Sequence, residues 1–520
     1  MSESSDMEAF DIVIIGAGPG GYSTALRAAE LGRRVALVER DATMGGTCLN
    51  RGCIPSKALI TATHTIDTVH RAAELGVQAH VDGIDYGTLR DYRVHIVETM
   101  TQGLSALLAH RGVTVFRASG SLEPASDDAG AMTRTVRLVA APGQTDVLRS
   151  DEADEPKPQG ASLELHATDV VLALGASPRP LPGNPFAGAL IDSTKALELD
   201  EFPASAVIVG AGAVAVEFAS MWNAAGVDVT MLIRRDRVLS HWDRRTGVTL
   251  TRELVRQGVK VVRNTAVKHV DTGANLGATV HYMQGGPSGA TGANGATGAN
   301  GAEHTVEAEM VLAAIGRDPN TDVDWLEAAG VRRDADGYVT CDPLGRTSAE
   351  HVWAVGDIVA GHALAHRAFE QGITVAEAIA GLDPKPVDEA SVPQVVFSHP
   401  EAACVGLTGR EAIDDPRFNN VKETIYPMMG NSRMLMSGVG GSMTVVSGER
   451  VDSEHPDTPE VLGVHIVSPV ASDVIAEAEQ LVGNHVALSD AARLIHPHPT
   501  FGETLGEALL KADGRPLHTR

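Results

Sequence analysis

The chain has 520 residues, too many for one hydrophobic core, so we expect three or four domains or subdomains. Its formal net charge of −25 argues against nucleic acid or an anionic membrane surface as a partner. Four cysteines are too few for a disulfide scaffold. The first residues show no secretion signal, and no stretch approaches the roughly eighteen apolar residues of a membrane span. These features predict a soluble protein of a reducing cytoplasm.

The first predicted unit combines two strands, a helix and a glycine-rich turn. In chain order, its elements are a strand at 10–15, a helix at 22–31 and a strand at 34–38. Gly16, Gly18 and Gly21 form GxGxxG after the first strand, which permits a tight turn, close approach of a pyrophosphate and close helix–strand packing. Glu39 ends the second strand at the spacing needed to accept hydrogen bonds from a ribose. The combination predicts an adenine dinucleotide site.

Two of the cysteines lie close together in the segment GGTCLNRGCIPSK, residues 45–57. Three interpretations of Cys48 and Cys53 are open: buried small side chains, part of a zinc site, or a redox-active dithiol. A zinc site needs four ligands, yet Cys341 and Cys404 are isolated and lack the paired spacing of structural zinc sites. The spacing therefore gives the zinc interpretation little support.

The geometry of a helix limits how these two cysteines can meet. Residues i and i+5 on an ideal helix lie about 140° apart around its axis. Cys48 and Cys53 can therefore join only where the helix is bent or distorted, and Gly52 and Pro55 can cause such a distortion. Lys57 lies one helical turn beyond Cys53, on the same face. Its positive charge would favour a thiolate there and negative charge on a group bound against that face.

A second unit of the same kind follows in the middle of the chain. Its expected elements are a strand at 206–209, a helix through residue 225 and a strand at 227–233. The turn between the first strand and the helix carries Gly210, Gly212 and Ala215. Arg234 and Arg235 end the last strand, where an NAD site normally has an acid, and arginines suit a 2′-phosphate. The alternative is a solvated basic loop.

Three segments are interpreted as surface insertions. Residues 140–160 are rich in Asp, Glu, Pro and Gly, and residues 448–460 are polar with two prolines. Residues 289–302 have glycine at every third position but contain no proline, which makes a collagen-like helix improbable for so short a run. A flexible hairpin extension is the preferred interpretation of that segment.

A later segment, VWAVGDIVAGHALAHRAFEQG from Val352, completes a recognisable set of motifs. Taken alone, Asp357 in this segment could merely cap a helix. Together with the glycine turns and the cysteine segment, however, it resembles the flavoprotein disulfide reductases from end to end, apart from the three insertions. The segments from Leu172 and Val311 resemble the two crossovers between that family's FAD and pyridine-nucleotide domains, with Leu174 where threonine is usual.

The resemblance implies an α/β fold with two Rossmann-like dinucleotide-binding domains, for FAD and NAD(P), and a C-terminal α+β dimerisation domain. The implied domains are an FAD-binding domain at 1–176, an NAD(P)-binding domain at 177–316 with a low-complexity insert at 285–303, a central domain at 317–390 that completes the FAD site, and an interface domain at 391–520.

The cysteine segment is very similar to that of the dihydrolipoamide dehydrogenases within this family. The resemblance implies that Cys48 exchanges with the substrate and that Cys53 faces the flavin. It also implies that Glu217 pairs with Lys57. The redox dithiol is therefore the preferred interpretation of the two cysteines.

The C-terminal segment IHPHPTFGE resembles the family's HPTxxE motif. His498 then corresponds to the acid–base histidine and Glu503 to the glutamate that orients it, whereas His496 is expected at the surface or in an interface. A histidine suits this task because its pKa lies near neutrality. In the family this segment reaches across a two-fold interface, so we expect a homodimer whose sites are shared between subunits.

The resemblance also supplies candidate cofactor-binding residues for FAD and for NADP(H) or NAD(H). They are Gly16, Gly18, Gly21, Glu39, Gly46, Thr47, Lys57, Ala118, Gly175, Asp357, Ala365, Gly210, Gly212, Ala215, Arg234, Arg235 and Gly316. The expected activity is an FAD-dependent dithiol–disulfide oxidoreductase of the dihydrolipoamide dehydrogenase type, acting on a small-molecule or lipoyl-domain disulfide. The alternatives are an NADPH-dependent reductase of a low-molecular-weight disulfide, a quinone-reducing flavoprotein, or a flavoprotein retained as a binding subunit.

Overall fold

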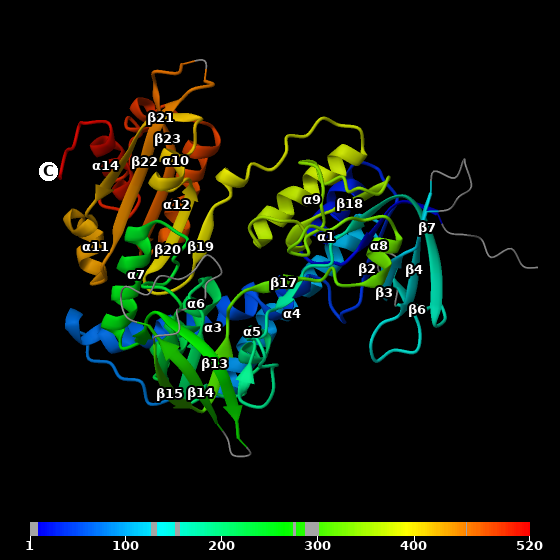
Figure 1. Ribbon diagram of the computed structural model, residues 1–520, viewed down its shortest axis with the longest axis horizontal. Helices are drawn as coiled ribbons and strands as arrows, with labels where there is room; N and C mark the ends of the chain where they lie inside the picture. The colour runs from blue at the N-terminus through cyan, green and yellow to red at the C-terminus, as the bar shows by residue number, and fades with distance from the viewer. Residues whose placement is uncertain are drawn as a thin grey trace, which may run out of the picture. The chain divides into compact units, whose positions relative to one another are not determined.

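The computed structural model describes residues 9–125, 133–150, 156–273, 277–285, 301–453 and 455–519, which form two compact units (Figure 1). The first unit comprises residues 1–58, 90–178 and 317–389; the second comprises 59–89, 179–316 and 390–520. Each unit is therefore assembled from three separate stretches of the chain.

The first unit is built on an eight-stranded sheet with the order β18-β7-β1-β2-β3-β5-β6, in which β4 pairs with both β3 and β7. The parallel neighbours are β18 (Val352–Ala354), β7 (Ser162–Leu172), β1 (Ala9–Ile15), β2 (Val35–Glu39) and β3 (Thr114–Leu122). The antiparallel additions are β4 (Arg134–Ala140), β5 (Leu148–Ser150) and β6 (Lys157–Pro158). Ile12, Val13 and Ile14 are fully buried, as expected for a parallel strand covered on both faces.

Two helices that are far apart in sequence pack together in this unit: α1 (Pro19–Glu30) and α9 (Ala365–Ile379) (Figure 1). Their contact depends on glycine. A Cβ on Gly372 would lie 2.7 Å from the Gly20 carbonyl oxygen, closer than carbon and oxygen can approach. The glycines therefore let the two helix backbones touch and bring the region after β18 close to the first glycine turn.

The two expected crossover segments meet in the first unit as a two-stranded ladder. β8 (Ala176–Pro178) pairs antiparallel with β17 (Arg317–Pro319). Asn320 reinforces the ladder, because its amide donates to the Leu174 carbonyl oxygen at 2.9 Å and its oxygen accepts from the Ser177 hydroxyl at 2.7 Å. The chain therefore leaves and re-enters this unit side by side.

The second unit contains a five-stranded parallel sheet with the order β12-β11-β10-β16-β9. Its strands are β12 (Lys260–Val262), β11 (Asp228–Leu232), β10 (Ser205–Val209), β16 (Met310–Ala313) and β9 (Leu190–Ile191). Helices α6 (Ala213–Ala224) and α7 (Arg244–Gln257) pack on it, and Trp222 of α6 is fully buried in its core.

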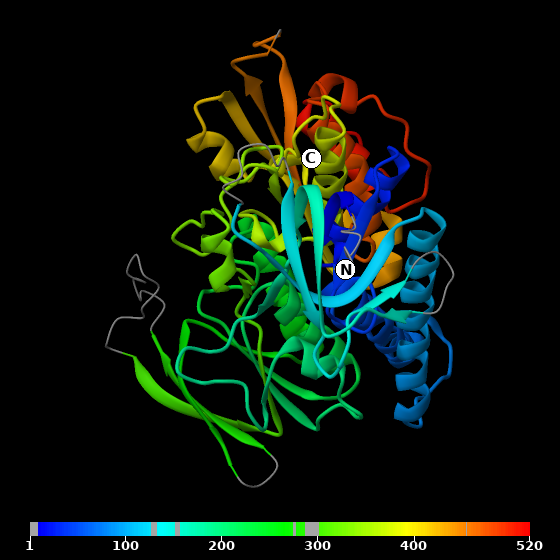
Figure 2. The ribbon, with the colours of Figure 1, turned by 90° about the vertical axis from the view of Figure 1, so that its right-hand side faces the viewer.

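An antiparallel sheet, β13 (Thr265–Thr272), β14 (Ala278–Gln284) and β15 (Ala302–Ala308), extends this domain (green in Figure 2). β14 and β15 flank the segment with glycine at every third position. A flexible hairpin extension was expected at residues 289–302, of which 289–300 lie outside the described residues. The two strands that bracket it pair antiparallel, in register from Ala278↔Ala308 to Gln284↔Ala302.

The other two expected insertions are partly built into sheets. Residues 140–160 contain the short strands β5 and β6, which add to the edge of the first unit's sheet. Residues 448–460 contain the end of β22 and the start of β23, so this segment is the connection of a hairpin. The two segments that were expected to be surface insertions therefore contain strands: an edge of the first unit's sheet in one case and the ends of two paired strands in the other.

The C-terminal part of the second unit is an antiparallel sheet covered by helices (Figure 1). In sheet order its strands are β19 (Gln394–Val396), β20 (Glu401–Gly406), β23 (Pro459–Ser468), β22 (Ser442–Arg450) and β21 (Phe418–Tyr426). α12 (Ala471–Gly483) packs on β20 and β23, and α14 (Glu503–Ala512) packs on β21 and β22. Apart from three helices described with the candidate active site, the other elements are η1 (Ala72–Leu75), α4 (Tyr86–His110), α5 (Ser193–Leu197), α8 (Asp324–Ala328), η3 (Glu389–Ser391), α10 (Gly409–Asp414), η4 (Met428–Gly430), α11 (Ser432–Ser437) and α13 (Leu488–Ala491).

The fold class predicted from the sequence is confirmed. Each of the two expected strand–turn–helix–strand units is present, with boundaries within three residues of those predicted, and the chain ends in a mixed domain with an antiparallel sheet. Within the described ranges, no helix combines the length and apolar character required to cross a bilayer.

Candidate active site

The first glycine turn has the backbone geometry that a bound pyrophosphate requires. Gly16 has φ +106°, and a Cβ there would collide with the Ala173 carbonyl oxygen. A Cβ on Gly21 would collide with the Gly16 carbonyl oxygen. Gly18 is the N-cap of α1, so the helix N-terminus opens on a position that carries no side chain. Gly16 and Gly21 therefore leave no room for a side chain, and the N–H groups of this cradle suit an anion.

Glu39 lies at the carboxyl end of β2 and is held over the glycine turn. Its Oε2 accepts from the Ala17 amide at 2.8 Å, and its Oε1 accepts from the Asp41 amide at 2.9 Å. Burial raises the pKa of this carboxyl group, and the backbone hydrogen bonds oppose that shift. Each carboxylate oxygen can accept more than one hydrogen bond, so both can still receive a ribose hydroxyl.

The expected distortion of the cysteine segment is present. α2 (Gly46–Arg51) carries Cys48 and ends before Gly52, whose φ of −142° and ψ of −107° are not helical. α3 (Cys53–Arg71) starts at the second cysteine. A Cβ on Gly52 would lie 2.9 Å from the Thr47 carbonyl oxygen, so this break favours glycine. The broken helix thereby overcomes the 140° offset and brings the two thiols together.

The side chains of the two cysteines interact directly through a hydrogen bond. A hydrogen bond with Cys53 and burial raise the pKa of Cys48, while the positive charge of Lys57 acts in the opposite direction. At Cys48 the effect of the lysine is smaller than the combined effect of burial and the hydrogen bond with Cys53. A thiol with a raised pKa needs a base to remove its proton, so the dithiol depends on a separate proton acceptor.

Asp357 lies in the short helix η2 (Gly356–Ile358), directly after β18. The interpretation that it caps the following helix is wrong, because α9 begins at Ala365 and its N-cap is Leu364. Burial raises the pKa of the Asp357 carboxyl group, and Arg317 and Arg367 lower it. This half-buried carboxylate is therefore available to a ligand.

The other candidate cofactor residues of the first unit lie on α2, β3 and α9 and before β8. Gly46 and Thr47 begin α2, and a Cβ on Gly46, whose φ is +57°, would lie 2.6 Å from the Gly18 Cα. The redox helix therefore starts directly against the glycine turn. Ala118 is buried in β3, Ala365 is the first residue of α9, and Gly175 adopts φ +69° before β8.

The second glycine turn repeats this geometry in the other unit. Gly210 has φ +142°, and a Cβ there would collide with the Ala314 carbonyl oxygen. Gly212 is the N-cap of α6, and Ala215 is fully buried on that helix at van der Waals distance from the Cβ position of Gly210. Alanine therefore fits as the third member of the motif. Gly316, with φ +130°, follows β16 at the crossover.

Arg234 and Arg235 are exposed in the turn after β11. Asp236, the first acid after the strand, is engaged by other arginines: its Oδ1 lies 2.9 Å from Arg237 Nη1 and its Oδ2 lies 3.5 Å from Arg244 Nη1. Asp236 is therefore paired with two arginines, whereas Arg234 and Arg235 face solvent. The turn therefore presents two exposed positive charges to solvent.

The histidine–glutamate pair expected near the C-terminus is formed. His498 Nδ1 lies 2.7 Å from Glu503 Oε2, at the start of α14. A carboxylate accepts hydrogen bonds, so this contact assigns the proton to Nδ1 and leaves Nε2 facing outward. The His498 side chain is 74% exposed, whereas Glu503 is 16% exposed.

His496 was expected at the surface or in an interface, and in the single chain it is largely covered by its own subunit. Its side chain is 10% exposed, and its Nε2 lies 2.9 Å from Glu477 Oε1 on α12. The hydrogen bond to Glu477 raises the pKa of His496. Packing against α14 explains the burial, since a Cβ on Gly506 would meet the imidazole ring.

Glu217 is buried on α6, and its Oε1 accepts from the Phe397 amide at 3.0 Å. It belongs to the second unit, whereas Lys57 belongs to the first. The pairing of these two residues therefore remains an expectation from the family resemblance.

Three residues near these sites were not identified from the sequence. Tyr22 of α1 lies near the dithiol. Burial and the charges of Cys48 and Cys53 raise the pKa of its hydroxyl. Arg237, two residues after Arg235, pairs with Asp236. Asn431 contacts Glu503 from 72 residues away, at 2.7 Å.

In the described part of the chain, no group of three or more His, Cys, Asp or Glu side chains is arranged to hold a metal ion.

Comparisons with known proteins agree with this arrangement. Residues 10–372 match the pyridine nucleotide-disulphide oxidoreductase family, and residues 392–509 match the dimerisation domain of that family. The chain therefore belongs to the pyridine nucleotide-disulphide oxidoreductases and is an oxidoreductase.

The individual relatives cover nearly the whole chain. A dihydrolipoyl dehydrogenase of Geobacillus stearothermophilus is 34% identical over 98% of this chain and 97% of its own length. One of Chlamydia pneumoniae is 32% identical over 98% of each. The crystal structure of LpdA from Mycobacterium tuberculosis superposes with a TM-score of 0.80 at 26% identity, covering 97% of this chain and 99% of that one.

Proposed function

We propose that this chain is a dihydrolipoyl dehydrogenase, which passes two electrons from a dihydrolipoyl dithiol to a pyridine nucleotide through Cys48 and Cys53. The observation that carries the proposal is the pair of thiols held together by the helix break at Gly52, with Lys57 on the same helix as Cys53. Relatives that span the whole chain and bear that name support the choice of substrate.

The residues of the first unit fit FAD. The glycine cradle suits its pyrophosphate, Glu39 suits the adenosine ribose, and Asp357 suits the ribityl chain. Bound FAD would supply the two-electron relay between the dithiol and the nicotinamide. Gly46 contributes by letting α2 start against the cradle, which places the dithiol helix next to the cofactor-binding turn.

The protein residues would manage the thiols and the protons. In the oxidised enzyme, a substrate thiolate attacks Cys48, the Cys48–Cys53 bond breaks, and the second substrate thiol displaces Cys48, leaving a cyclic disulfide product and two enzyme thiols. His498 would remove protons from the substrate thiols, with Glu503 holding the imidazole in the tautomer that exposes Nε2. Lys57 would stabilise the negative charge left near Cys53.

A steady-state panel tests this proposal against its alternatives. Dihydrolipoamide, glutathione disulfide and a quinone would each be assayed with NAD(H) and with NADP(H). Dihydrolipoamide should give the highest kcat/KM. The Arg234–Arg235 turn favours one second candidate, an NADPH-dependent reductase of a low-molecular-weight disulfide, and that candidate would be preferred if glutathione disulfide exceeded dihydrolipoamide.

We also propose a homodimer in which each active site uses residues of both subunits. The match of residues 392–509 to a dimerisation domain supports it. The 74% exposure of His498 in the single chain supports it too, because acid–base catalysis works best where a second surface excludes water.

Subunit exchange provides the next prediction. A dimer of one Cys48→Ser and one His498→Gln subunit should contain one fully wild-type site and one doubly altered site. An equal mixture forms about half heterodimers, so activity should recover to roughly a quarter of wild type after exchange. Steady-state turnover before and after mild dissociation measures this. If the mixture stayed at the activity of its inactive parents, the sites would lie within single subunits.

The exposed arginines support acceptance of NADP(H). A 2′-phosphate carries up to two negative charges and would form charge-assisted hydrogen bonds with Arg234 and Arg235. Because Asp236 is held by Arg237 and Arg244, it does not repel the phosphate as a free carboxylate would. We expect a preference for NADP(H) of about tenfold to a hundredfold, since solvent weakens hydrogen bonds on an exposed turn.

The double variant Arg234→Glu, Arg235→Ala tests this expectation. Its kcat/KM with NADPH should fall by the same tenfold to hundredfold, about the strength of one or two screened hydrogen bonds, while NADH use stays equal or improves. Arg410→Glu, at a 91% exposed arginine of α10, is the control for the Arg234→Glu part of this variant, because both substitutions change the surface charge by the same amount. A wild-type preference for NADH would show that the arginines form only a solvated turn.

A further inference from the structure

The glutamate that orients His498 is itself held from its other oxygen. Glu503 Oε2 lies 2.7 Å from His498 Nδ1, and Glu503 Oε1 accepts from the Asn431 amide at 2.7 Å. The two contacts use different carboxylate oxygens, so they fix both the position and the rotation of the carboxylate plane. The second contact comes from a residue outside the HPTxxE segment.

The Asn431 side chain has one orientation that satisfies all of its neighbours. Its Nδ2 donates to Glu503 Oε1 and, at 3.1 Å, to the Thr500 carbonyl oxygen, while its Oδ1 accepts from the Met434 amide at 3.1 Å. Exchanging the oxygen and nitrogen would place an acceptor against two acceptors and a donor against a donor. Asn431 is 4% exposed, so solvent does not compete for these hydrogen bonds.

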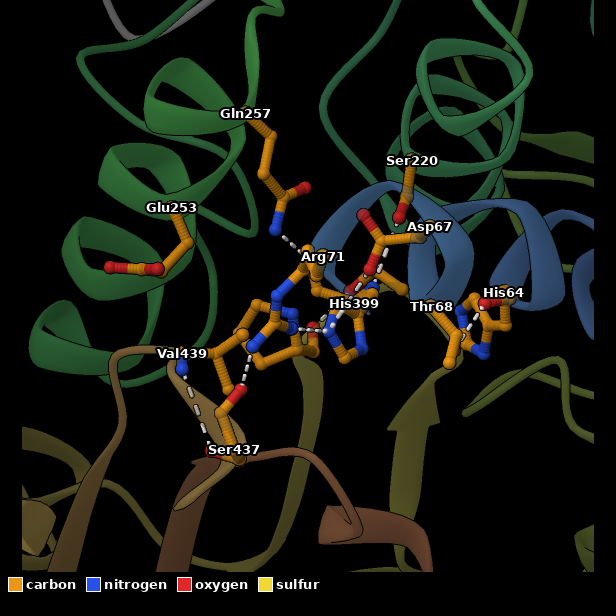
Figure 3. A network of polar contacts seen from close by, with 12 residues as sticks. His64, Asp67, Thr68, Arg71, Ser220, Glu253, Gln257, His399, Ser437 and Val439 are labelled. Carbon is orange, nitrogen blue, oxygen red and sulfur yellow. Dashed lines mark hydrogen bonds and ion pairs between the residues drawn. The ribbon is translucent and has the colours of Figure 1, made fainter. Parts of the chain in front are cut away.

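The same side chain also starts a helix, which gives it a fixed base. Asn431 is the N-cap of α11 (Ser432–Ser437). At the other end of α11, the guanidinium of Arg71, the last residue of α3, donates to the Ser437 carbonyl oxygen (Figure 3). Arg71 Nη1 is in turn 3.2 Å from His399 Nε2. α11 is thus anchored at both ends, and its N-cap cannot shift freely relative to Glu503.

We propose that Asn431 is a positioning residue for the acid–base pair: it holds the Glu503 carboxylate in the orientation that aligns His498. This inference rests on the proposed function, since it concerns the proton transfer that His498 would perform. Asparagine suits the task because it donates to Glu503 without adding charge. An aspartate would cap the helix equally well but would repel Glu503.

The experiment separates positioning from helix capping. Asn431→Ser keeps a capping oxygen but is too short to reach Glu503, and Asn431→Ala loses both contacts. Thr408→Ala is the matched control, because Thr408 caps α10, another helix of six residues in the same unit. Asn431→Ala should lose the most thermal stability, because it removes the cap and leaves Glu503 without a buried partner, and Asn431→Ser and Thr408→Ala should each lose less.

Turnover should fall in the variants that lose the Asn431 side-chain amide and should not fall in the variant that loses only a helix cap. We expect both Asn431 variants to lose about tenfold to a hundredfold in kcat with dihydrolipoamide, with KM little changed, because a misplaced proton-transfer group slows the chemical step. The solvent deuterium isotope effect on kcat should rise. Thr408→Ala should keep wild-type kcat, and all three variants should keep NAD(P)H-dependent reduction of ferricyanide, which needs no thiol.

The possible failures are distinguishable. If Asn431→Ser kept wild-type kcat and isotope effect while His498→Gln was impaired, Asn431 would be a helix cap only, and the positioning role would be refuted. If His498→Gln itself kept full dihydrolipoamide turnover, the proposed function would fail, and with it the basis for positioning by Asn431.

Discussion

Cys48→Ser should abolish turnover of dihydrolipoamide while FAD stays bound. A serine hydroxyl cannot form the disulfide that accepts electrons from the substrate, so the expected loss is complete within the sensitivity of the assay. FAD should remain because the glycine cradle, Glu39 and Asp357, which we propose hold it, are not altered. Steady-state turnover and the flavin absorbance of the purified protein measure the two effects.

Cys341→Ser is the matched control for this substitution. Cys341 is also a partly buried cysteine of the first unit, and burial raises the pKa of its thiol. The same chemical change at Cys341 should leave turnover close to wild type. Near-full dihydrolipoamide activity of Cys48→Ser would rule out the dithiol as the redox centre.

His498→Gln should reduce kcat with dihydrolipoamide by a factor on the order of 10² to 10⁴, the usual contribution of a positioned acid–base group. The glutamine amide can replace only part of the hydrogen bonding of the imidazole ring. It cannot exchange a proton near neutral pH. Reduction of ferricyanide by NAD(P)H should be retained, because that reaction bypasses the thiols. Pre-steady-state reduction of the enzyme by dihydrolipoamide measures the affected step.

His496→Gln is the control, and the structure gives it a different expected effect. The hydrogen bond to Glu477 raises the pKa of His496 above its ordinary value of 6.5. The pair should therefore stabilise the fold fully below about pH 6.5, and this stabilisation should decline as the pH rises through the folded-state pKa. His496→Gln should lower Tm more at acidic than at alkaline pH, with little effect on kcat. Equal and small effects of the two substitutions on kcat would place the acid–base group elsewhere.

The sequence predicted those parts of the site that depend on backbone geometry within a few residues. The positive φ of Gly16 and Gly210 and the break of the redox helix at Gly52 follow from which residues tolerate those conformations. The His498–Glu503 contact is also local, since the two residues are five positions apart. Such features need no knowledge of the remaining fold.

Contacts between distant segments could not be predicted in the same way. The pairing of Asn431 with Glu503 and the contact of His496 with Glu477 on α12 depend on how separate elements pack. Nothing in the local sequence around Asn431 distinguishes it from an ordinary turn residue. Its contact with Glu503 becomes visible only when the tertiary structure brings the start of α11 to the start of α14.

By itself, the sequence determined the two glycine turns, because residue type and short spacing along the chain specify them. Its resemblance to a known family predicted the fold class and the paired cysteines. The tertiary structure alone decided which side chains surround the acid–base pair, that Asp357 does not cap α9, and that residues 59–89 belong with the second unit. The physical reason is that backbone stereochemistry acts over a few residues, whereas hydrogen bonds, burial and charge depend on neighbours that only the complete packing brings together.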